Sequence, residues 1–186
     1  MITRKNEHKG FFLRPAAFAA IILLLTAGCG NSKGPSQYDG LTSLNSFTAA
    51  TLDGNEFTEK NFSDYDVTII NVWSTTCGPC INEMPHLAEY QKNLDDNVQM
   101  ITYCMDGSSK GDKAREILDG SGYEGITLTG GDKDLETFSN EIMYFPTMIF
   151  VDRKGNIIGE ALIGAPSDFK KAYDVKLSNT FLLLGK

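Results

Sequence analysis

Residues 73–80 read Trp-Ser-Thr-Thr-Cys-Gly-Pro-Cys and place two cysteines, Cys77 and Cys80, three positions apart. An apolar, β-branched run at 67–72 precedes this stretch, and apolar residues at helical spacing follow it. The run predicts a strand that is buried on both faces, and the spacing predicts a helix that begins at the cysteines. The free N–H groups and the dipole of a helix N-terminus stabilise a thiolate. The sequence therefore predicts a redox pair at a strand–helix junction.

Strands and helices are expected to alternate along the rest of the chain. The expected elements are a hairpin over 46–59, a strand over 98–105, helices over 112–118 and 133–141, a brief strand over 126–128, a hairpin over 147–163, and a last helix that Ser167 caps and Gly185 ends. Strands that alternate with helices pair in parallel, and the late hairpin adds antiparallel strands at one side. We therefore expect an α/β fold with a mixed central sheet flanked by helices.

The N-terminus is interpreted as an export signal over residues 1–28. Four basic residues precede an apolar run at 16–25, which is too short to span a bilayer comfortably. An uncleaved membrane anchor is the alternative for this segment. The small residues before Cys29 resemble a bacterial lipobox, which implies that cleavage leaves Cys29 as a lipidated N-terminus. We then expect a flexible tether over 29–45 and one domain over 46–186, held at the outer face of the cell membrane.

The charge of the chain limits its partners. Without residues 1–28 it has 13 basic and 23 acidic residues, a net charge near −10. A domain this acidic is not expected to bind nucleic acid or an anionic membrane surface by electrostatics.

Several motifs in order carry a family likeness that covers roughly residues 45–178. They are Asn71-Val72-Trp73, Cys77-Gly78-Pro79-Cys80, Glu83-Met84-Pro85, Phe145-Pro146-Thr147 and the turn from Asp152 to Asn156. In this series the chain resembles membrane-anchored thiol–disulfide oxidoreductases of the TlpA/ResA type. The resemblance implies a thioredoxin fold with an N-terminal β-hairpin and a central helix-and-strand insertion.

Three residues are the predicted catalytic group. Cys77 would attack a partner disulfide, and Cys80 would resolve the mixed disulfide. In the resembled family, a Glu at the position of Glu83 is a buried acid that tunes the cysteines and moves protons; a surface Glu that complements the helix dipole is the alternative. Thioredoxins carry a buried Asp where this chain has Asn71, which cannot titrate.

The surface around the pair is expected to bind substrate. The resemblance implies that Pro146 is a cis-proline and that the backbone of Phe145 pairs with an incoming peptide. Trp73 is expected beside the cysteines, with burial in the core as the alternative, and the two can hold together. Thr76 stands where thioredoxins often have a second Trp. Cys104 is expected at the same sheet edge as a buried, inert thiol.

The predicted activity is the reduction of protein disulfides outside the cytoplasm, without a cofactor. Gly78-Pro79 between the cysteines resembles the reducing thioredoxins. A reductant in an oxidising compartment must itself be reduced again, so a membrane electron donor resembling CcdA is implied. The resemblance also implies apocytochrome c or a methionine sulfoxide reductase as the substrate. The alternatives are a disulfide-forming oxidant, a thiol peroxidase and a copper-delivering module. A peroxidase is disfavoured because Ile70 stands where a peroxiredoxin needs proline, and a copper module is disfavoured because no His follows His86. A zinc site is disfavoured because zinc normally takes four ligands and the sequence has no second close pair of cysteines or histidines.

Overall fold

The computed structural model of this chain describes residues 40–186. The expected signal peptide, Cys29 and most of the tether lie outside the described residues. In the described part, no helix combines the length and the apolar character that a membrane crossing requires.

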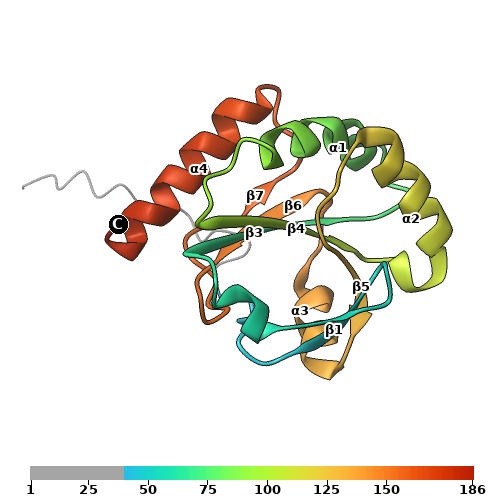
Figure 1. The fold of residues 1–186 in the computed structure, drawn as a ribbon, viewed down its shortest axis with the longest axis horizontal. Coiled ribbons are helices and arrows are strands. Elements are labelled where there is room, and N and C mark those ends of the chain that lie inside the picture. Colours follow the sequence, from blue (N-terminus) through green and yellow to red (C-terminus); the bar gives the residue numbers. More distant parts are fainter. Residues whose placement is uncertain (1–39) are drawn as a thin grey trace, which may run out of the picture. The chain divides into compact units, whose positions relative to one another are not determined.

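One mixed sheet of seven strands organises the described chain, in the order β2-β1-β5-β4-β3-β6-β7 (Figure 1). The strands are β1 (Thr48–Thr51), β2 (Glu56–Thr58), β3 (Val67–Trp73), β4 (Val98–Cys104), β5 (Thr127–Gly131), β6 (Thr147–Val151) and β7 (Leu162–Ile163). β3 is parallel to β4, β4 is parallel to β5, and the other neighbours are antiparallel. This arrangement confirms the expected mixed sheet with its N-terminal hairpin and its late antiparallel strands.

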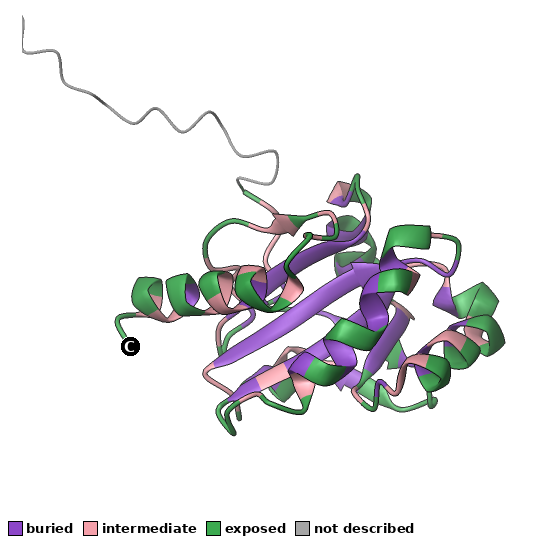
Figure 2. Cartoon of the chain, turned by 90° about the horizontal axis from the view of Figure 1, so that it is seen from above, coloured by how far each residue is buried: buried purple, intermediate pink, exposed green. Residues whose placement is uncertain are grey.

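Helices cover both faces of the sheet. They are α1 (Gly78–Gln91), α2 (Gly107–Ser121), α3 (Lys133–Glu141), α4 (Phe169–Leu184) and the short 3-10 helix η1 (Glu59–Phe62). One buried cluster joins the sheet to α1, α2 and α4, and a second cluster joins it to α3 and η1. Figure 2 shows the buried strands between these layers, with exposed residues on the outer sides of the helices.

The central strand β3 is buried along its whole length. Successive side chains of a strand point to opposite faces, so Val67, Ile69 and Trp73 belong to the α1 cluster while Ile70 and Val72 belong to the α3 cluster. An apolar run without alternation is what a strand covered on both faces requires. The register of β3 therefore decides which of its residues face the helix of the cysteine pair.

Two elements, the second helix and the last strand, differ in their bounds from the sequence-based expectation. The helix expected at 112–118 runs over Gly107–Ser121 with a kink at Lys110. The sequence does not predict its start because the glycine- and serine-rich first turn consists of weak helix formers. The strand expected up to Ile163 is reduced to a bridge at Ile157 and to β7, because Gly159 has φ +69° and turns the chain out of the extended form.

The cap of the last helix and the end of β5 also differ. Asp168, not Ser167, caps α4 by accepting the N–H of Lys171. The strand expected at 126–128 continues through Gly131, whose backbone lies against β1 too closely for a side chain.

We predict that Gly155→Ala destabilises the domain. Gly155 has φ +79°, and a Cβ there would lie 2.1 Å from the backbone oxygen of Leu44. The free energy of unfolding in urea should fall by at least about 2 kcal/mol. Gly120→Ala is the matched control, since a Cβ at that position of α2 meets nothing within 4 Å, and it should be neutral or slightly stabilising. Equal stability of the two variants would contradict the prediction.

Candidate active site

The two cysteines stand at the start of α1. Cys77 is the N-cap residue, and Pro79 lies in the first turn. N–H groups of the first turn have no acceptor within the helix, so the N–H that proline lacks costs no hydrogen bond there. The Cys77 and Cys80 sulfurs form a disulfide, with the two Cα atoms 5.3 Å apart. The Cys80 N–H donates to the Cys77 sulfur at 3.2 Å. The same free N–H groups can stabilise a thiolate at Cys77 when the disulfide is opened.

The two sulfurs differ in access. Cys77 is half-buried, whereas Cys80 is only 1% exposed. A partner disulfide can therefore be approached by Cys77, while Cys80 is covered by the core cluster that includes Met84 and Tyr173. This asymmetry is what an attacking and a resolving cysteine need, and the assignment of those roles stays a prediction.

Glu83 is buried one turn after Cys80. It is 2% exposed, its Oε2 accepts the Asn71 side-chain amide at 3.4 Å, and its Oε1 accepts the hydroxyl of Tyr173. Burial raises the pKa of Glu83, and the hydrogen bonds from Tyr173 and Asn71 oppose this only in part. The carboxyl group is thus placed to accept or give a proton in a water-poor site. A first-turn surface Glu, the alternative considered from the sequence, would be exposed.

Asn71 completes the surroundings of this carboxyl group. It lies on β3, on the same face as Trp73, and its Oδ1 has no hydrogen-bond partner within residues 40–186. The terminal amide can turn over, and its oxygen would then accept a proton that Glu83 carries. Asn71 therefore suits both protonation states of Glu83.

Hydrogen bonds to Asp106, which the sequence did not predict, hold the loop before the cysteines. Asp106 accepts the N–H of Thr75 at 2.9 Å, the hydroxyl of Thr75 at 2.6 Å and the thiol of Cys104 at 3.3 Å. Burial raises the pKa of Asp106, but the hydrogen bonds from Thr75 outweigh it, so its pKa lies below the usual range. An Asp two residues after a strand carries no signal for a partner 31 positions earlier.

Cys104 is the free cysteine of the described residues, and it is fully buried. Burial, and then its hydrogen bond to Asp106, raise the pKa of its thiol to about 12. The thiolate is the reactive form of cysteine, so this thiol is inert at neutral pH. The sequence predicts a buried, inert thiol at this position.

The expected substrate surface is brought together on one side of the sheet edge. Val72 of β3 pairs with Thr147 of β6 in an antiparallel register. Trp73, which follows Val72, and Pro146, which precedes Thr147, therefore lie side by side. The Phe145–Pro146 bond is cis, which confirms the expected geometry. Thr76 is exposed beside Cys77.

Trp73 is placed differently from a surface contact. It is fully buried in the α1 cluster, and its Nε1 has no hydrogen-bond partner among the described residues. A substrate can reach Thr76 and Phe145, which is half-buried, without a rearrangement of Trp73. The roles predicted for these residues in substrate binding stay predictions.

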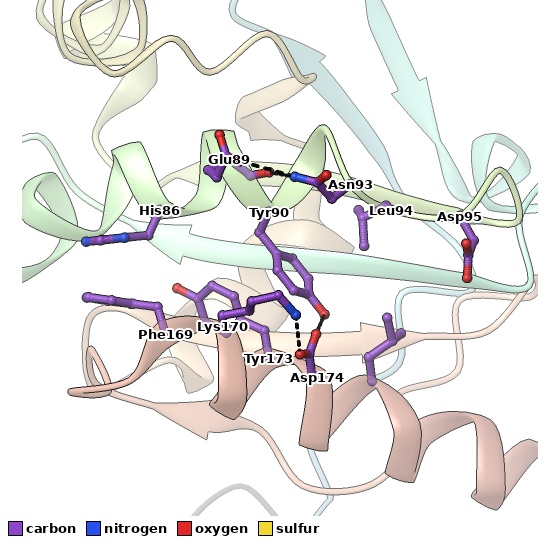
Figure 3. Close-up of a pocket in the computed structure, with 11 residues that line it drawn as sticks. His86, Glu89, Tyr90, Asn93, Leu94, Asp95, Phe169, Lys170, Tyr173 and Asp174 are labelled. Atoms are coloured by element: carbon purple, nitrogen blue, oxygen red, sulfur yellow. Dashed lines mark hydrogen bonds and ion pairs between the residues drawn. The ribbon is translucent and has the colours of Figure 1, made fainter.

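A groove of about 280 Å³ lies between α1 and α4 (Figure 3). Its lining includes Tyr173, whose hydroxyl donates to Glu83. His86 on α1 stacks on Phe169 of α4, with ring centroids 4.1 Å apart. Further along, Tyr90 donates its hydroxyl to Asp174 at 3.1 Å. These contacts bind α4 to the helix that bears the cysteines.

Fold and site together define a thiol–disulfide oxidoreductase of thioredoxin fold. The Redoxin family model matches residues 41–176, and the chain belongs to the Redoxin family. It is 25% identical over 155 residues to the thiol-disulfide oxidoreductase ResA of Bacillus cereus, covering 77% of this chain and 85% of ResA. It is 27% identical over 132 residues to the thioredoxin-like protein YneN of Bacillus subtilis, covering 70% of this chain and 74% of YneN.

The solved structures agree on the fold. A thiol:disulfide interchange protein of the thioredoxin family from Chlorobium tepidum superimposes with a TM-score of 0.61 at 20% identity, over 76% of this chain and 97% of that one. The StoA protein of Bacillus subtilis superimposes with a TM-score of 0.54 at 20% identity, over 70% of this chain and 95% of that one.

We predict that Glu83 makes the stability of the oxidised protein depend on pH. A carboxyl group with a raised pKa in the folded chain contributes its stability below the unfolded-state pKa, and this contribution is lost as the pH rises through the folded-state pKa. From about pH 4 to about pH 8, wild type should therefore lose unfolding free energy relative to Glu83→Gln.

The measurement is urea unfolding of both proteins across this range. Glu89→Gln, at an exposed position of the same helix, serves as the control and should follow wild type. Parallel curves for wild type and Glu83→Gln would show that the carboxyl group is not the source of the dependence.

Proposed function

We propose that this protein reduces disulfides of partner proteins outside the cytoplasm, with Cys77 as the attacking and Cys80 as the resolving cysteine. The single observation that supports this most is the asymmetry of the pair at the N-terminus of α1. The more exposed sulfur caps the helix, and the covered one lies a turn before a buried acid.

The proposed reaction takes place in two displacements. The Cys77 thiolate attacks one sulfur of the partner disulfide, a Cys77–partner bond forms, and the other partner sulfur leaves as a thiolate that takes up a proton. Cys80 then gives its proton to the Glu83 carboxylate, and its thiolate attacks Cys77. The Cys77–Cys80 disulfide forms, and the second partner sulfur leaves as a thiolate that takes up a proton. Two electrons pass from the protein to its partner.

The N-terminal sequence and the reaction support the proposed location and partners. The basic and apolar leader at 1–28 and the lipobox-like Cys29 support a lipid anchor on the outer face of the cell membrane. The oxidised pair must be reduced again there, and a membrane thiol donor resembling CcdA is the proposed partner for that step. Apocytochrome c and an oxidised methionine sulfoxide reductase are the proposed substrates.

Trapping tests the assignment of the two cysteines. In Cys80→Ala the second displacement is blocked, so Cys77 should accumulate in mixed disulfides with its substrates in the native compartment. These adducts should disappear on reduction, and mass spectrometry should place them on Cys77. Cys77→Ala is the matched control. Adducts of similar yield in both variants would overturn the assignment.

The reduction potential tests the direction of the reaction. Within this fold, thioredoxin lies at about −270 mV and the oxidant DsbA at about −120 mV. Equilibration of the Cys77–Cys80 pair with thiol buffers should give a value near the reducing end of this range. A value near the oxidising end would identify a disulfide-forming protein instead.

A further inference from the structure

A hydrogen bond between two distant segments reaches the proposed proton acceptor. Tyr173 lies on α4, 90 positions after Glu83, and its hydroxyl donates to Oε1 of the Glu83 carboxyl group. Tyr173 is fully buried, and Glu83 is nearly so. Buried polar groups need protein partners because water does not reach them, and the Tyr173 hydroxyl finds its partner in Glu83, while Glu83 accepts from both Tyr173 and Asn71.

Aromatic neighbours on both helices hold the ring of Tyr173 in place. Tyr90 on α1 meets it edge-on with centroids 5.1 Å apart, and Phe169 meets it at 6.2 Å. Figure 3 shows Tyr173 among these rings at the groove between α1 and α4. The phenol is thus held by packing, and its hydroxyl has little freedom to leave Glu83.

The phenol acts as a donor in either state of Glu83. Burial, and then the charge of Glu83, raise the pKa of Tyr173, so it stays neutral over the whole working range. A neutral hydroxyl that donates to a carboxylate stabilises the ionised form over the protonated form. Tyr173 therefore opposes the effect of burial on Glu83.

We propose that Tyr173 is a positioning residue of the reaction: it holds the Glu83 carboxyl group in place one turn after Cys80 and favours its ionised, proton-accepting form. The proposal rests on the proposed function, in which Glu83 takes the proton of Cys80. It adds a residue from the last helix to a site that otherwise comes from β3, the loop before α1, α1 and the loop before β6.

Other titratable groups lie around this pair and belong in the design of a test. Cys80 lies one turn before Glu83 on α1, and the Tyr90 ring meets Tyr173. Asp174, which accepts the Tyr90 hydroxyl, is paired with Lys170 at 2.6 Å. His86 stacks on Phe169. On the β3 side the neighbour is Asn71, which does not titrate.

The test separates the two displacements with a coloured probe. The full chain carries Cys29→Ser so that the reagent reports on the redox pair, and the reduced protein is mixed with dithiobis(nitrobenzoate). Attack by Cys77 breaks the reagent disulfide and releases one thionitrobenzoate anion. Attack by Cys80 on Cys77 releases the second anion as Glu83 takes up the Cys80 proton. The rate of the second release is recorded against pH.

In wild type, the plot of the second release rate against pH should show an inflection where Glu83 titrates. Glu83→Gln should remove this inflection. Tyr173→Phe keeps the ring and removes the hydrogen bond, so this inflection should move up by about one pH unit. At a pH about one unit below the wild-type inflection the second rate should then fall by up to about tenfold, while the first rate is unchanged. A general loss of structure would change both rates.

Tyr123→Phe is the matched control. Tyr123 is also buried, and its hydroxyl donates to the Met100 carbonyl at 3.2 Å, away from Glu83. It should leave the inflection at the wild-type pH. If Tyr173→Phe also leaves it there while Glu83→Gln removes it, the proposal is overturned and the proposed function stands. If Glu83→Gln leaves the pH profile unchanged, the role of Glu83 fails and this proposal fails with it.

A second measurement needs no variant of Tyr173. With tyrosine labelled at the ring carbon that bears the hydroxyl, the NMR signal of Tyr173 should shift with pH at the inflection of Glu83. The shift should vanish in Glu83→Gln. A Tyr173 signal that does not respond to pH in wild type would overturn the proposal even where Tyr173→Phe does not fold.

Discussion

The register of β3 is the constraint on which the rest of the site depends. This strand is paired on both sides and buried on both faces, so a slip by one residue would turn Asn71 and Trp73 away from α1. In the observed register, Asn71 meets Glu83, and the strand ends where α1 can begin at Cys77. The pairing of β3 with β6 places the cis-proline loop at the same edge.

Burial gives the two cysteines and the acid their separate properties. Cys77 remains accessible and receives an N–H at the helix start, whereas Cys80 and Glu83 lie in the core under α4. Low polarity disfavours charge on Glu83, so this carboxyl group holds a proton more readily than a surface acid does. The hydrogen bonds from Tyr173 and Asn71 limit that effect. The chemistry therefore depends on a balance between desolvation and a few directed donors.

Much of the fold could be predicted from local patterns. β3 and α3 lie where the sequence predicts them, and β6 begins the hairpin expected from residue 147, because each combines strong periodicity or a β-branched run with clear end signals. The start of α2 and the length of β7 could not be predicted. Weak helix formers begin α2, where Gly107 lies against Thr129 of β5 too closely for a side chain, so tertiary contacts outweigh local preference there. The last strand is interrupted by Gly159, which has a positive φ.

The sequence by itself determined the chemistry of the site, since two cysteines three positions apart, before a helical pattern and after a buried strand, define a redox pair at a helix start. It also indicated Glu83 and Pro146 through the family resemblance. Only the tertiary structure decided which distant groups meet them. Tyr173 reaches Glu83 and Asp106 reaches Thr75 because the packing of α4 on α1 and the pairing of β3 with β4 bring them together. Hydrogen bonds over such separations depend on packing between elements, and local sequence patterns do not encode that packing.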